Sequence, residues 1–556
     1  MTITAAPTVK DRCLEVRGKV ILTHVTGNIV VSPVVGTESA FLGATSTVSS
    51  SRHVFDLGIL QGYKLLSLFR VKIWWMIPPV GRSASDVPME TQLLLLKKEK
   101  SLRLRMKPTT ENTCYILLLP VLDGQFRTTL QGTQSNELQL CIERDAYVQA
   151  SQSLEAAFVN SGDNPFELIR DSIKILEKHK GTFCHLENKR IPAHLDWFGW
   201  STWDAFYTEV SPQGIKEGLQ SFSNEGCSPK FIIIDDGWQE TLNTFRKEGE
   251  PVIEGTQFVT RLIDIKENKK FTNAGSENSV NNLHHFVDSI KQNMNSKHET
   301  AESHAAARSI GGCAVYVSDK PGNHDFKILK KLVLPDGSVL RARYAGHPTR
   351  DCLFEDPVMD GKSLLKICNL NVLTGVVGVF NCQGAGSWSL KSLEAAPSCI
   401  TISGKVRPLD VEFLEEAAGE NWNGDCIVYA FNAGLLSKVS CRGKLEVSLE
   451  TLHCEIYTVS PIRVFGHDVQ FAPIGLLDMY NSGGAIEALD CTMDVAQCVV
   501  KIKGRGCGRF GAYSNVRPKS CVVDMKEEEF SYIPENGLLT ITLGCEGNSR
   551  DMEFVY

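Results

Sequence analysis

The feature that most constrains the fold is a change of pattern along the chain. Strand and helix patterns alternate only between about residues 192 and 343, which is typical of parallel β/α units. Both flanks consist of short apolar runs separated by Gly, Ser and Pro, as in antiparallel β domains. We therefore predict an N-terminal β-sandwich over residues 1–190, a β/α region over 191–345 and a C-terminal antiparallel β domain over 346–556.

The middle region is short for the architecture that its pattern suggests. A closed (β/α)8 barrel needs about 250 residues, whereas only about 150 lie between Pro192 and Arg343. We therefore expect an incomplete (β/α)8 barrel of the TIM type within a multidomain α/β plus β protein. Apolar residues at helical spacing predict helices over residues 164–179, 211–226, 283–294 and 297–310.

Composition places the chain among ordinary globular proteins. Its 556 residues are 42% hydrophobic and 22% charged, and the net charge is −7. That charge argues against binding to nucleic acid or to an anionic membrane surface. The first residues contain no continuous apolar segment, so we expect no secretory signal, and apolar runs such as 114–122 are too short to span a bilayer. We expect a soluble, cytoplasmic protein with no membrane or nucleic-acid partner.

The 18 cysteines are scattered between Cys13 and Cys545, without a C-x-x-C pair. Scattered cysteines in a chain without a signal peptide are usually small buried hydrophobic residues in a reducing compartment. We therefore expect free thiols in place of a disulfide framework. We also expect no metal site and no cofactor.

Two short motifs resemble functional signatures without the context they require. Gly506-x-Gly508-x-x-Gly511 has the spacing of a dinucleotide fingerprint, but the residues after it do not open a helix. His284 and His285 are consecutive, so they point to different faces of a helix and are not expected to share a metal. We interpret the first motif as turn glycines and the second as ordinary helix residues.

Two other segments carry side chains suited to chemistry. GWSTWD (199–204) and DDGW (235–238) each end a predicted buried strand, and in a β/α barrel the carboxyl ends of the strands meet on one face. Carboxylates accept hydrogen bonds from hydroxyls, and a flat indole covers the apolar face of a pyranose. This combination suits a sugar better than a phosphate, which requires cationic or N–H donors. The alternative left open is that the tryptophans belong to the core and the aspartates cap helices.

The longer segments GWSTWDAFYTEVSPQGIKEGLQSF and PKFIIIDDGWQE resemble the barrel opening of plant raffinose synthases, alkaline α-galactosidases and seed imbibition proteins, in glycoside hydrolase family 36. The resemblance is strongest to the branch of seed imbibition proteins similar to galactinol–sucrose galactosyltransferases. It extends to FLGATSTVSSSRHVFDLGIL, GGCAVYVSDKPG and FAPIGLLDMYNSGGAI, and covers nearly all of the chain. Ser201 stands where the family commonly has Cys.

The resemblance implies an enzyme that transfers a galactosyl group from galactinol to sucrose, or hydrolyses α-galactosides, by retaining double displacement. It implies that Trp203 walls a galactose pocket. Asp235 and Asp236 would accept hydrogen bonds from galactose hydroxyls, chiefly O4 and O6, and Trp238 would support that shell. The implied ligands are galactinol, sucrose and other α-galactosides. The sequence does not predict the oligomeric state.

The catalytic carboxylates that the resemblance implies are missing. The family nucleophile is an aspartate in a K-V-D-like strand and its acid/base is an aspartate in an R-x-S-E/D-D-like segment; neither occurs here. The chain passes from a segment resembling the helix before the third barrel strand to one resembling the approach to the eighth, with a seam near residues 294–295. We therefore predict no catalytic residue, an internally truncated barrel and a chain inactive as written.

Two alternatives remain open at this point. The first is a non-catalytic galactoside-binding or regulatory isoform. The second is an active glycosidase that uses other acids, although a retaining pair must lie about 5–5.5 Å apart and the sequence does not place any two of them so. The acids available are Asp264, Asp288, Glu302, Asp319 and Asp325.

Overall fold

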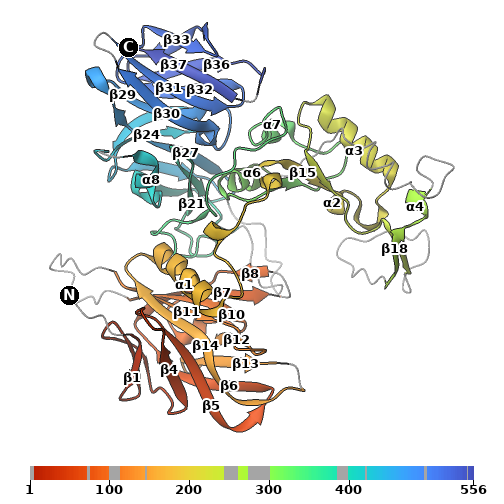
Figure 1. Ribbon diagram of the computed structural model, residues 1–556, viewed down its shortest axis with the longest axis vertical. Helices are drawn as coiled ribbons and strands as arrows, with labels where there is room; N and C mark the ends of the chain where they lie inside the picture. The colour runs from red at the N-terminus through yellow and green to blue at the C-terminus, as the bar shows by residue number, and fades with distance from the viewer. Residues whose placement is uncertain are drawn as a thin grey trace. The chain divides into compact units, whose positions relative to one another are not determined.

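The computed structural model describes residues 6–71, 75–98, 113–144, 147–242, 261–272, 301–384, 399–419, 422–493, 497–547 and 549–556. The described chain divides into two compact units (Figure 1). The first holds residues up to Arg190 together with Asp351–Asp356, and the second holds the other described residues from Ile191 onward. The predicted seam at 294–295, Asp288 and the two consecutive histidines lie outside the described residues.

The first unit is built from fourteen antiparallel strands that hydrogen-bond into one continuous sheet. Its main path runs β1-β2-β3-β6-β13-β12-β10-β11-β14-β5-β4, with β7 joining β10, β8 and β9. The strands are β1 Thr8–Lys10, β2 Cys13–Val16, β3 Lys19–Thr23, β4 Ile29–Pro33, β5 Ala40–Ser50, β6 Arg52–Leu60, β7 Tyr63–Val71, β8 Trp75–Ile77, β9 Val80–Gly81, β10 Thr91–Lys98, β11 Tyr115–Pro120, β12 Arg127–Gly132, β13 Glu137–Glu143 and β14 Ala150–Gly162.

Both faces of this sheet are covered near its centre. Leu94 and Leu96 of β10 belong to the main core, whereas Leu95 packs with Leu168 of helix α1 (Pro165–Lys180) on the other face. This explains the uninterrupted apolar run of β10, because a strand buried on both faces does not alternate in polarity. The predicted helix over 164–179 is confirmed. The side chain of Asn164 caps its first turn by accepting two backbone hydrogen bonds.

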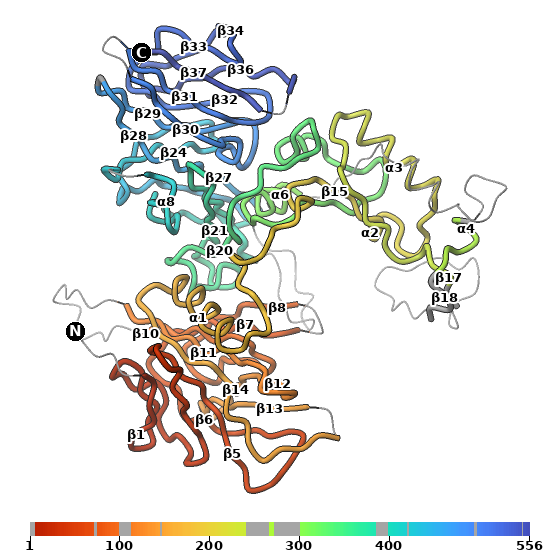
Figure 2. Tube along the Cα trace, in the orientation of Figure 1, coloured from red at the N-terminus to blue at the C-terminus, as the bar shows by residue number. Residues whose placement is uncertain are grey.

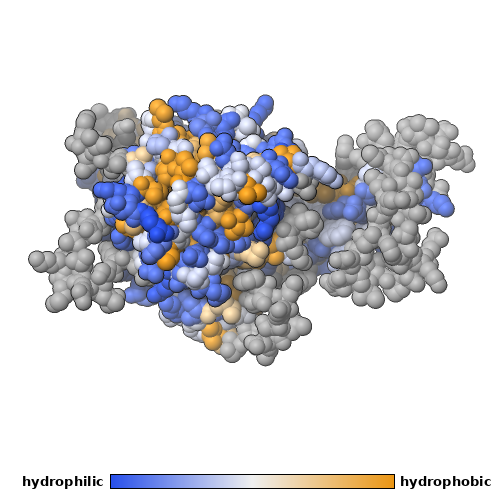
Figure 3. Space-filling view, turned by 90° about the horizontal axis from the view of Figure 1, so that it is seen from below, coloured by the Kyte–Doolittle hydropathy of each residue, from blue (hydrophilic) through white to orange (hydrophobic). Residues whose placement is uncertain are grey.

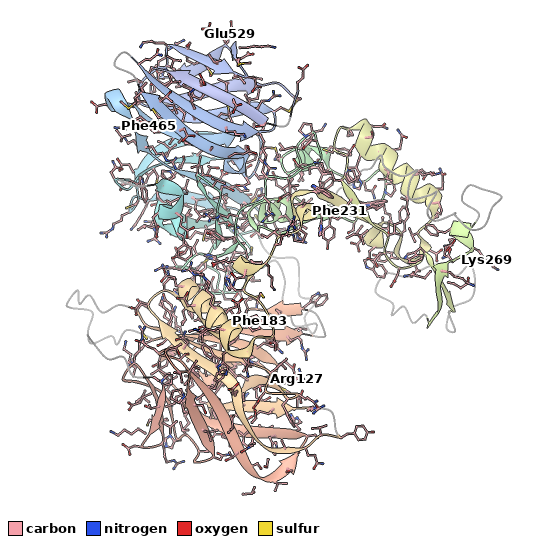
Figure 4. The ribbon with its side chains drawn as sticks, in the orientation of Figure 1. Arg127, Phe183, Phe231, Lys269, Phe465 and Glu529 are labelled. Atoms are coloured by element: carbon pink, nitrogen blue, oxygen red, sulfur yellow. A yellow bond between two sulfur atoms is a disulfide. The ribbon has the colours of Figure 1, made fainter. Side chains whose placement is uncertain are left out.

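The second unit begins with a parallel sheet of three strands, in the order β16-β15-β19. The strands are β15 Phe198–Ser201, β16 Phe231–Ile233 and β19 Val315–Val317. Gly199 of β15 pairs with Phe231, and a Cβ at this glycine would lie 2.2 Å from the Phe231 ring, so a larger residue here would force that ring to move. Phe231 is labelled in Figure 4.

Helices cover this sheet. Helix α3 (Pro212–Asn224) follows the Ser211 N-cap, and its Gly218 lies directly against the ring of Trp200, which is fully buried. The described residues of the region also form the helices α2 Trp203–Phe206, α4 Lys269–Thr272, α6 Ala301–Ile310 and α7 Phe326–Leu329. Strands β17 (Gln239–Leu242) and β18 (Arg261–Glu267) form an antiparallel hairpin beside α4, as the tube in Figure 2 shows.

The rest of the second unit is antiparallel. One sheet has the order β20-β21-β22-β27-β24-β25, and β23 pairs with β26 beside helix α8 (Leu414–Ala418). These strands are β20 His347–Pro348, β21 Leu365–Leu370, β22 Gly375–Phe380, β23 Ile402–Val406, β24 Asp425–Ala430, β25 Leu435–Ser440, β26 Leu445–Leu449 and β27 Cys454–Pro461.

The C-terminal part is a sandwich of two five-stranded sheets, β28-β29-β32-β36-β35 and β30-β31-β37-β33-β34. Phe471 from the first sheet meets Phe554 from the second, with ring centroids 5.6 Å apart, inside a shared core. The strands are β28 Arg463–Val464, β29 Gln470–Leu476, β30 Ile486–Met493, β31 Cys498–Arg505, β32 Gly508–Ser514, β33 Ser520–Val523, β34 Lys526–Glu527, β35 Phe530–Ile533, β36 Leu538–Leu543 and β37 Ser549–Val555.

The multidomain, β-rich fold predicted from the sequence is confirmed. The strands of the first unit join one continuous hydrogen-bonded sheet, and the predicted division of the chain into an N-terminal β-sandwich, a barrel region and a C-terminal β domain stays a prediction. In the middle region the described residues contain three parallel strands, and a larger barrel stays a prediction. A helix does not follow Gly506, as the sequence predicts, but the interpretation as turn glycines is wrong for Gly508 and Gly511, which lie in β32.

The expectation of free thiols is wrong for one pair, because the structure joins Cys507 to Cys545 by a disulfide. Cys507 immediately precedes β32 and Cys545 follows β36, and these strands pair antiparallel with Gly508 opposite Leu543. Strand pairing therefore brings together two cysteines that are 38 positions apart in sequence. The other sixteen described cysteines are not part of a disulfide.

A helix able to cross a membrane is not found in the described part of the chain. On the face drawn in Figure 3, apolar residues lie interspersed among hydrophilic ones. The exposed apolar residues Val35, Val48 and Met525 occur singly along the sequence, whereas Trp75 and Met76 are adjacent. Single exposed apolar residues are normal for a water-facing surface.

Candidate site at the carboxyl edge of the parallel sheet

The candidate site is formed where the three parallel strands end. Strand β15 leads into Thr202 and Trp203, β16 into Asp235 and Asp236, and β19 into Ser318. Parallel strands place their carboxyl ends at the same edge of a sheet. The backbone therefore brings the two segments singled out in the sequence to one edge.

Thr202 connects the first two strand ends. It is fully buried, and its backbone N–H donates to the carbonyl oxygen of Ile233 at 3.0 Å. Its hydroxyl oxygen in turn accepts a hydrogen bond of 2.9 Å from the backbone N–H of Asp235. Two hydrogen bonds in opposite directions thus fix the end of β16 against the end of β15. They also fix the backbone of Asp235, from which its side chain extends.

The two aspartates form a compact turn. The Asp235 carboxylate accepts a hydrogen bond of 2.8 Å from the backbone N–H of Asp236, and the Asp236 carboxylate accepts one of 3.2 Å from the side chain of Gln239. Asp235 is half-buried and Asp236 is exposed. Each carboxylate keeps acceptor capacity beyond these bonds, because an ionised carboxylate can accept about four.

Gly237 and Asn268 determine the path of the chain after the aspartates. Gly237 has a φ of +106°, and a Cβ there would lie 2.5 Å from the carbonyl oxygen of Thr208. The Asn268 side chain donates to the carbonyl of Gly237 at 2.6 Å, and its backbone N–H donates to the carbonyl of Trp238 at 2.8 Å. The DDGW turn is therefore held from both sides.

The two tryptophans differ in their surroundings. Trp203 begins α2, is half-buried, and places its ring nearly perpendicular to Tyr207 with centroids 5.5 Å apart. Trp238 is half-buried and packs against the hydrophobic core of the second unit. Trp203 thus lies at the sheet edge and is a candidate for one wall of a ligand site. Trp238 instead contacts the hydrophobic core next to the turn.

The third strand end is tied to the first by polar contacts. The Ser318 hydroxyl donates a short hydrogen bond to the carboxylate of Asp204, and the Trp200 indole donates to the carbonyl of Asp319 at 3.3 Å. Asp204 is exposed. These contacts join the segment after β19 to that after β15, so all three strand ends are linked by hydrogen bonds.

Most of the acidic residues considered as replacements for the missing catalytic carboxylates have structural roles or lie outside the described residues. Glu302 accepts hydrogen bonds from Lys331 at 2.7 Å and from the Tyr480 hydroxyl at 3.0 Å, and the hydrogen bond from Lys331 lowers the pKa of Glu302. Asp325 caps α7 by accepting from two backbone N–H groups. The Asp264 side chain and all of Asp288 are outside the described residues.

Asp319 is the remaining candidate. Its carboxylate has no hydrogen bond or ion pair within the described residues. It lines a pocket of about 320 Å³ that runs along β19 between α6 and α7, together with Asp325, His304 and Arg308. Asp235 and Asp236 do not line this pocket. A group of three His, Cys, Asp or Glu residues able to hold a metal ion is not found in the described ranges.

Several residues that build the site were not singled out by the sequence. Thr202, Asn268 and the pair of Asp204 with Ser318 all position the strand ends. Thr202 and Asp204 lie within the GWSTWD segment, so the sequence already indicates that they lie at the same strand end as Trp203. Asn268 is distant in sequence from the turn it holds and carries no such signal.

A family model described as "Raffinose synthase or seed imbibition protein Sip1" matches residues 8–295 and 292–543. The probable galactinol–sucrose galactosyltransferase 1 of Arabidopsis thaliana is 34% identical over 750 aligned positions, covering 98% of each chain. The galactinol–sucrose galactosyltransferase of Pisum sativum is 29% identical over 724 positions, covering 92% of this chain and 89% of its own.

Among solved structures, a GH36 alpha-galactosidase from Geobacillus stearothermophilus in complex with stachyose is similar with a TM-score of 0.33 and 8% identity. That similarity covers 76% of this chain and 79% of the other.

Proposed function

Because this chain belongs to the raffinose synthase or seed imbibition protein family, we propose that it binds an α-galactoside at the carboxyl edge of the β16-β15-β19 sheet without transferring or hydrolysing the galactosyl group. The expected ligands are galactinol, raffinose-type sugars and other α-galactosides. The observation that carries the proposal is the fixed turn at Asp235 and Asp236, whose carboxylates keep free acceptor capacity at that edge.

The chemistry of the turn favours recognition of a sugar. Galactose hydroxyls donate hydrogen bonds, and hydrogen bonds to charged acceptors contribute about 1.5–3 kcal/mol each. Trp203 supplies an aromatic face at the same edge for the apolar side of a pyranose. Because Thr202 and Asn268 already hold the turn, little conformational entropy is lost on binding.

The order of the strands supports the assignment of this edge to the family's barrel. In a closed eight-stranded barrel, the first strand lies between the second and the last. Strand β15 lies in parallel between β16, which follows it, and β19, which comes more than a hundred residues later. This order is the one expected if the three strands are the first, second and eighth of that barrel.

Two features of the comparisons support the proposal that this chain lacks internal strands of the family's barrel. The match to the family model divides into two segments that meet at residues 292–295, where the sequence predicts the seam. The alignment with the Arabidopsis relative has 750 positions although this chain has 556 residues, so it includes positions at which this chain has no residue. We infer that the strands carrying the nucleophile and acid/base aspartates are among those missing positions.

The second candidate function is galactosyl transfer or hydrolysis by substitute acids. The observation in its favour is that Asp319 and Asp325 line one pocket. Against it, Asp325 is used as a helix cap and retaining chemistry needs two carboxylates placed as nucleophile and acid/base. We therefore place this function second.

A cytoplasmic location also stays a prediction, which subcellular fractionation would test.

Calorimetry with galactose and galactinol tests the proposed function. Saturable binding to the purified chain that the double variant Asp235→Asn and Asp236→Asn weakens, or that loses one of two binding components in this variant, supports it. The variant Asp490→Asn provides a matched control, because Asp490 is an exposed aspartate on β30 of the C-terminal sandwich. Binding that is unchanged by the double variant would assign the ligand to another part of the chain.

A further inference from the structure

We propose that the second unit contains a separate carbohydrate site at the opposite, amino-terminal edge of the parallel sheet, built around Trp197. A pocket of about 350 Å³ lies there. Trp197 immediately precedes β15 and Lys230 immediately precedes β16, so this pocket is at the other end of the strands from Trp203 and Asp235. Arg505, Cys507 and Cys545 from the C-terminal sandwich also line it.

The walls of this pocket are fixed by the fold. Trp197 forms an isolated antiparallel bridge with Ser338, and Phe198 donates its backbone N–H to the carbonyl of Gly337 at 3.0 Å. On the sandwich side, the disulfide between Cys507 and Cys545 ties together the two loops that contribute to the pocket. A pocket of this volume is within the range of ligand sites, roughly 300–1,000 Å³, and its pre-formed walls reduce the entropy lost on binding.

The lining offers the three kinds of contact that a sugar ring uses. Trp197 is 37% exposed, so an indole face is available for the apolar side of a pyranose, and its ring N–H has no partner in the described part of the chain. Glu487 is exposed and its carboxylate also has no partner there, which leaves an acceptor for hydroxyls. Arg505 uses one guanidinium nitrogen for the carbonyl of Val339 at 3.0 Å and keeps further donors.

The charges around the pocket favour a neutral ligand. Asp196 is paired with Arg341, and Asp336 is paired with Lys230. The two remaining charges, Glu487 and Arg505, are opposite in sign. A phosphorylated or anionic ligand would need a net positive lining, which this pocket does not offer. A neutral mono- or oligosaccharide satisfies both the donors and the acceptors.

This site goes beyond the proposed function, because it shares neither residues nor sheet edge with the Asp235 site. The two sites can therefore fail independently. If both exist, the chain binds two sugars. If only the Trp197 site exists, binding survives the double variant Asp235→Asn and Asp236→Asn unchanged and disappears in Trp197→Ala.

The test is calorimetry of that double variant, in the full chain, against glucose, galactose, sucrose and raffinose. We expect saturable binding of at least one of these sugars, weakened about tenfold or more by adding Trp197→Ala and by adding Glu487→Ala. Trp197→Phe keeps an aromatic face and should retain most of the affinity, which separates a lost stacking surface from misfolding. Trp75→Ala, at an exposed tryptophan of the first unit, should have no effect.

Two results would overturn the proposal. One is the absence of saturable heat from every sugar in the panel, with the double variant shown to be folded by its thermal transition. The other is binding that Trp197→Ala and Glu487→Ala leave unchanged.

Discussion

The hydroxyl of Thr202 accepts a hydrogen bond of 2.9 Å from the backbone N–H of Asp235, and this contact links the carboxyl ends of two parallel strands. Thr202 is fully buried, so the bond is shielded from water. Asp235 begins the turn that presents both candidate sugar-binding carboxylates. The geometry of the site thus depends on a residue that has no direct contact with a ligand in our proposal.

Replacing Thr202 by Val should therefore weaken galactoside binding without removing a ligand contact. Valine has nearly the same shape but cannot accept the Asp235 N–H, and loss of one such hydrogen bond costs about 0.5–1.5 kcal/mol. We expect galactose affinity to fall by about three- to tenfold in calorimetry. Thr202→Ser keeps the hydroxyl and should bind like the unaltered chain. Equal affinities for the Val and Ser variants would contradict a positioning role for Thr202.

The carboxylates of Asp235 and Asp236 should contribute more to galactose affinity than the Thr202 hydrogen bond does. In a Trp197→Ala background, which silences the second proposed site, we expect the double variant Asp235→Asn and Asp236→Asn to lower galactose affinity by at least about tenfold. Each substitution replaces a charged acceptor by a neutral one, and charge-assisted hydrogen bonds are about twice as strong as neutral ones. Asp490→Asn in the same background should bind normally. A double variant that binds as tightly as this control would disprove the assignment.

His324 should make the second unit sensitive to acid. The ring is 7% exposed, is stacked on Phe222 with centroids 4.2 Å apart, and has no hydrogen bond at either nitrogen within the described structure. Burial lowers the pKa of His324 from 6.5 to about 3. The unfolded chain therefore binds a proton below pH 6.5 that the folded chain does not, and stability falls as pH decreases from 6.5 toward 3.

The expected loss from this residue is on the order of 2–4 kcal/mol across that window. Thermal unfolding of His324→Phe should show a shallower fall of the melting temperature on acidification than the unaltered chain. His24→Phe changes an exposed histidine of the first unit and should leave the fall unchanged. An identical pH profile for His324→Phe and the unaltered chain would mean that His324 titrates normally in the fold.

The Cys507–Cys545 bond should stabilise the C-terminal sandwich. It closes a loop across 38 positions, and disulfides of this kind contribute about 2–4 kcal/mol. We expect Cys507→Ser with Cys545→Ser, or a reducing agent, to lower the corresponding thermal transition. Cys184→Ser, at an exposed free cysteine, should not. Peptide mapping without reduction should find the bond directly, and its absence in protein purified under oxidising conditions would contradict the assignment.

Local sequence patterns predicted the features that depend on local interactions. The 164–179 helix follows from apolar spacing and an Asn cap, and the antiparallel flanks follow from short strands between turn residues. The DDGW turn follows from two adjacent carboxylates and a glycine directly after an apolar run, a pattern typical of a ligand site at a sheet edge. The prediction that this run is a buried strand is wrong, because β16 is only partly buried and Ile233 is 41% exposed. In each case one short segment contains the whole physical cause.

Features that depend on which strands become neighbours did not follow from the sequence. Cys507 and Cys545 meet through the pairing of β32 with β36, and Asn268 reaches the DDGW turn from a distant segment. The Trp197 pocket likewise joins the start of β15 to loops of the C-terminal sandwich. A periodic pattern defines an element and its buried face, but it does not define register or partner.

The claim that the chain recognises α-galactosides without processing them is tested most directly by a transfer assay. The purified chain is given galactinol and sucrose at neutral to alkaline pH, with the Pisum sativum galactosyltransferase as a positive control, and raffinose is quantified by chromatography. We predict no raffinose above the enzyme-free blank, in a preparation that binds galactose by calorimetry. Raffinose formation that Asp319→Asn abolishes would contradict the account, because it would show that a remaining acid of this chain performs the chemistry.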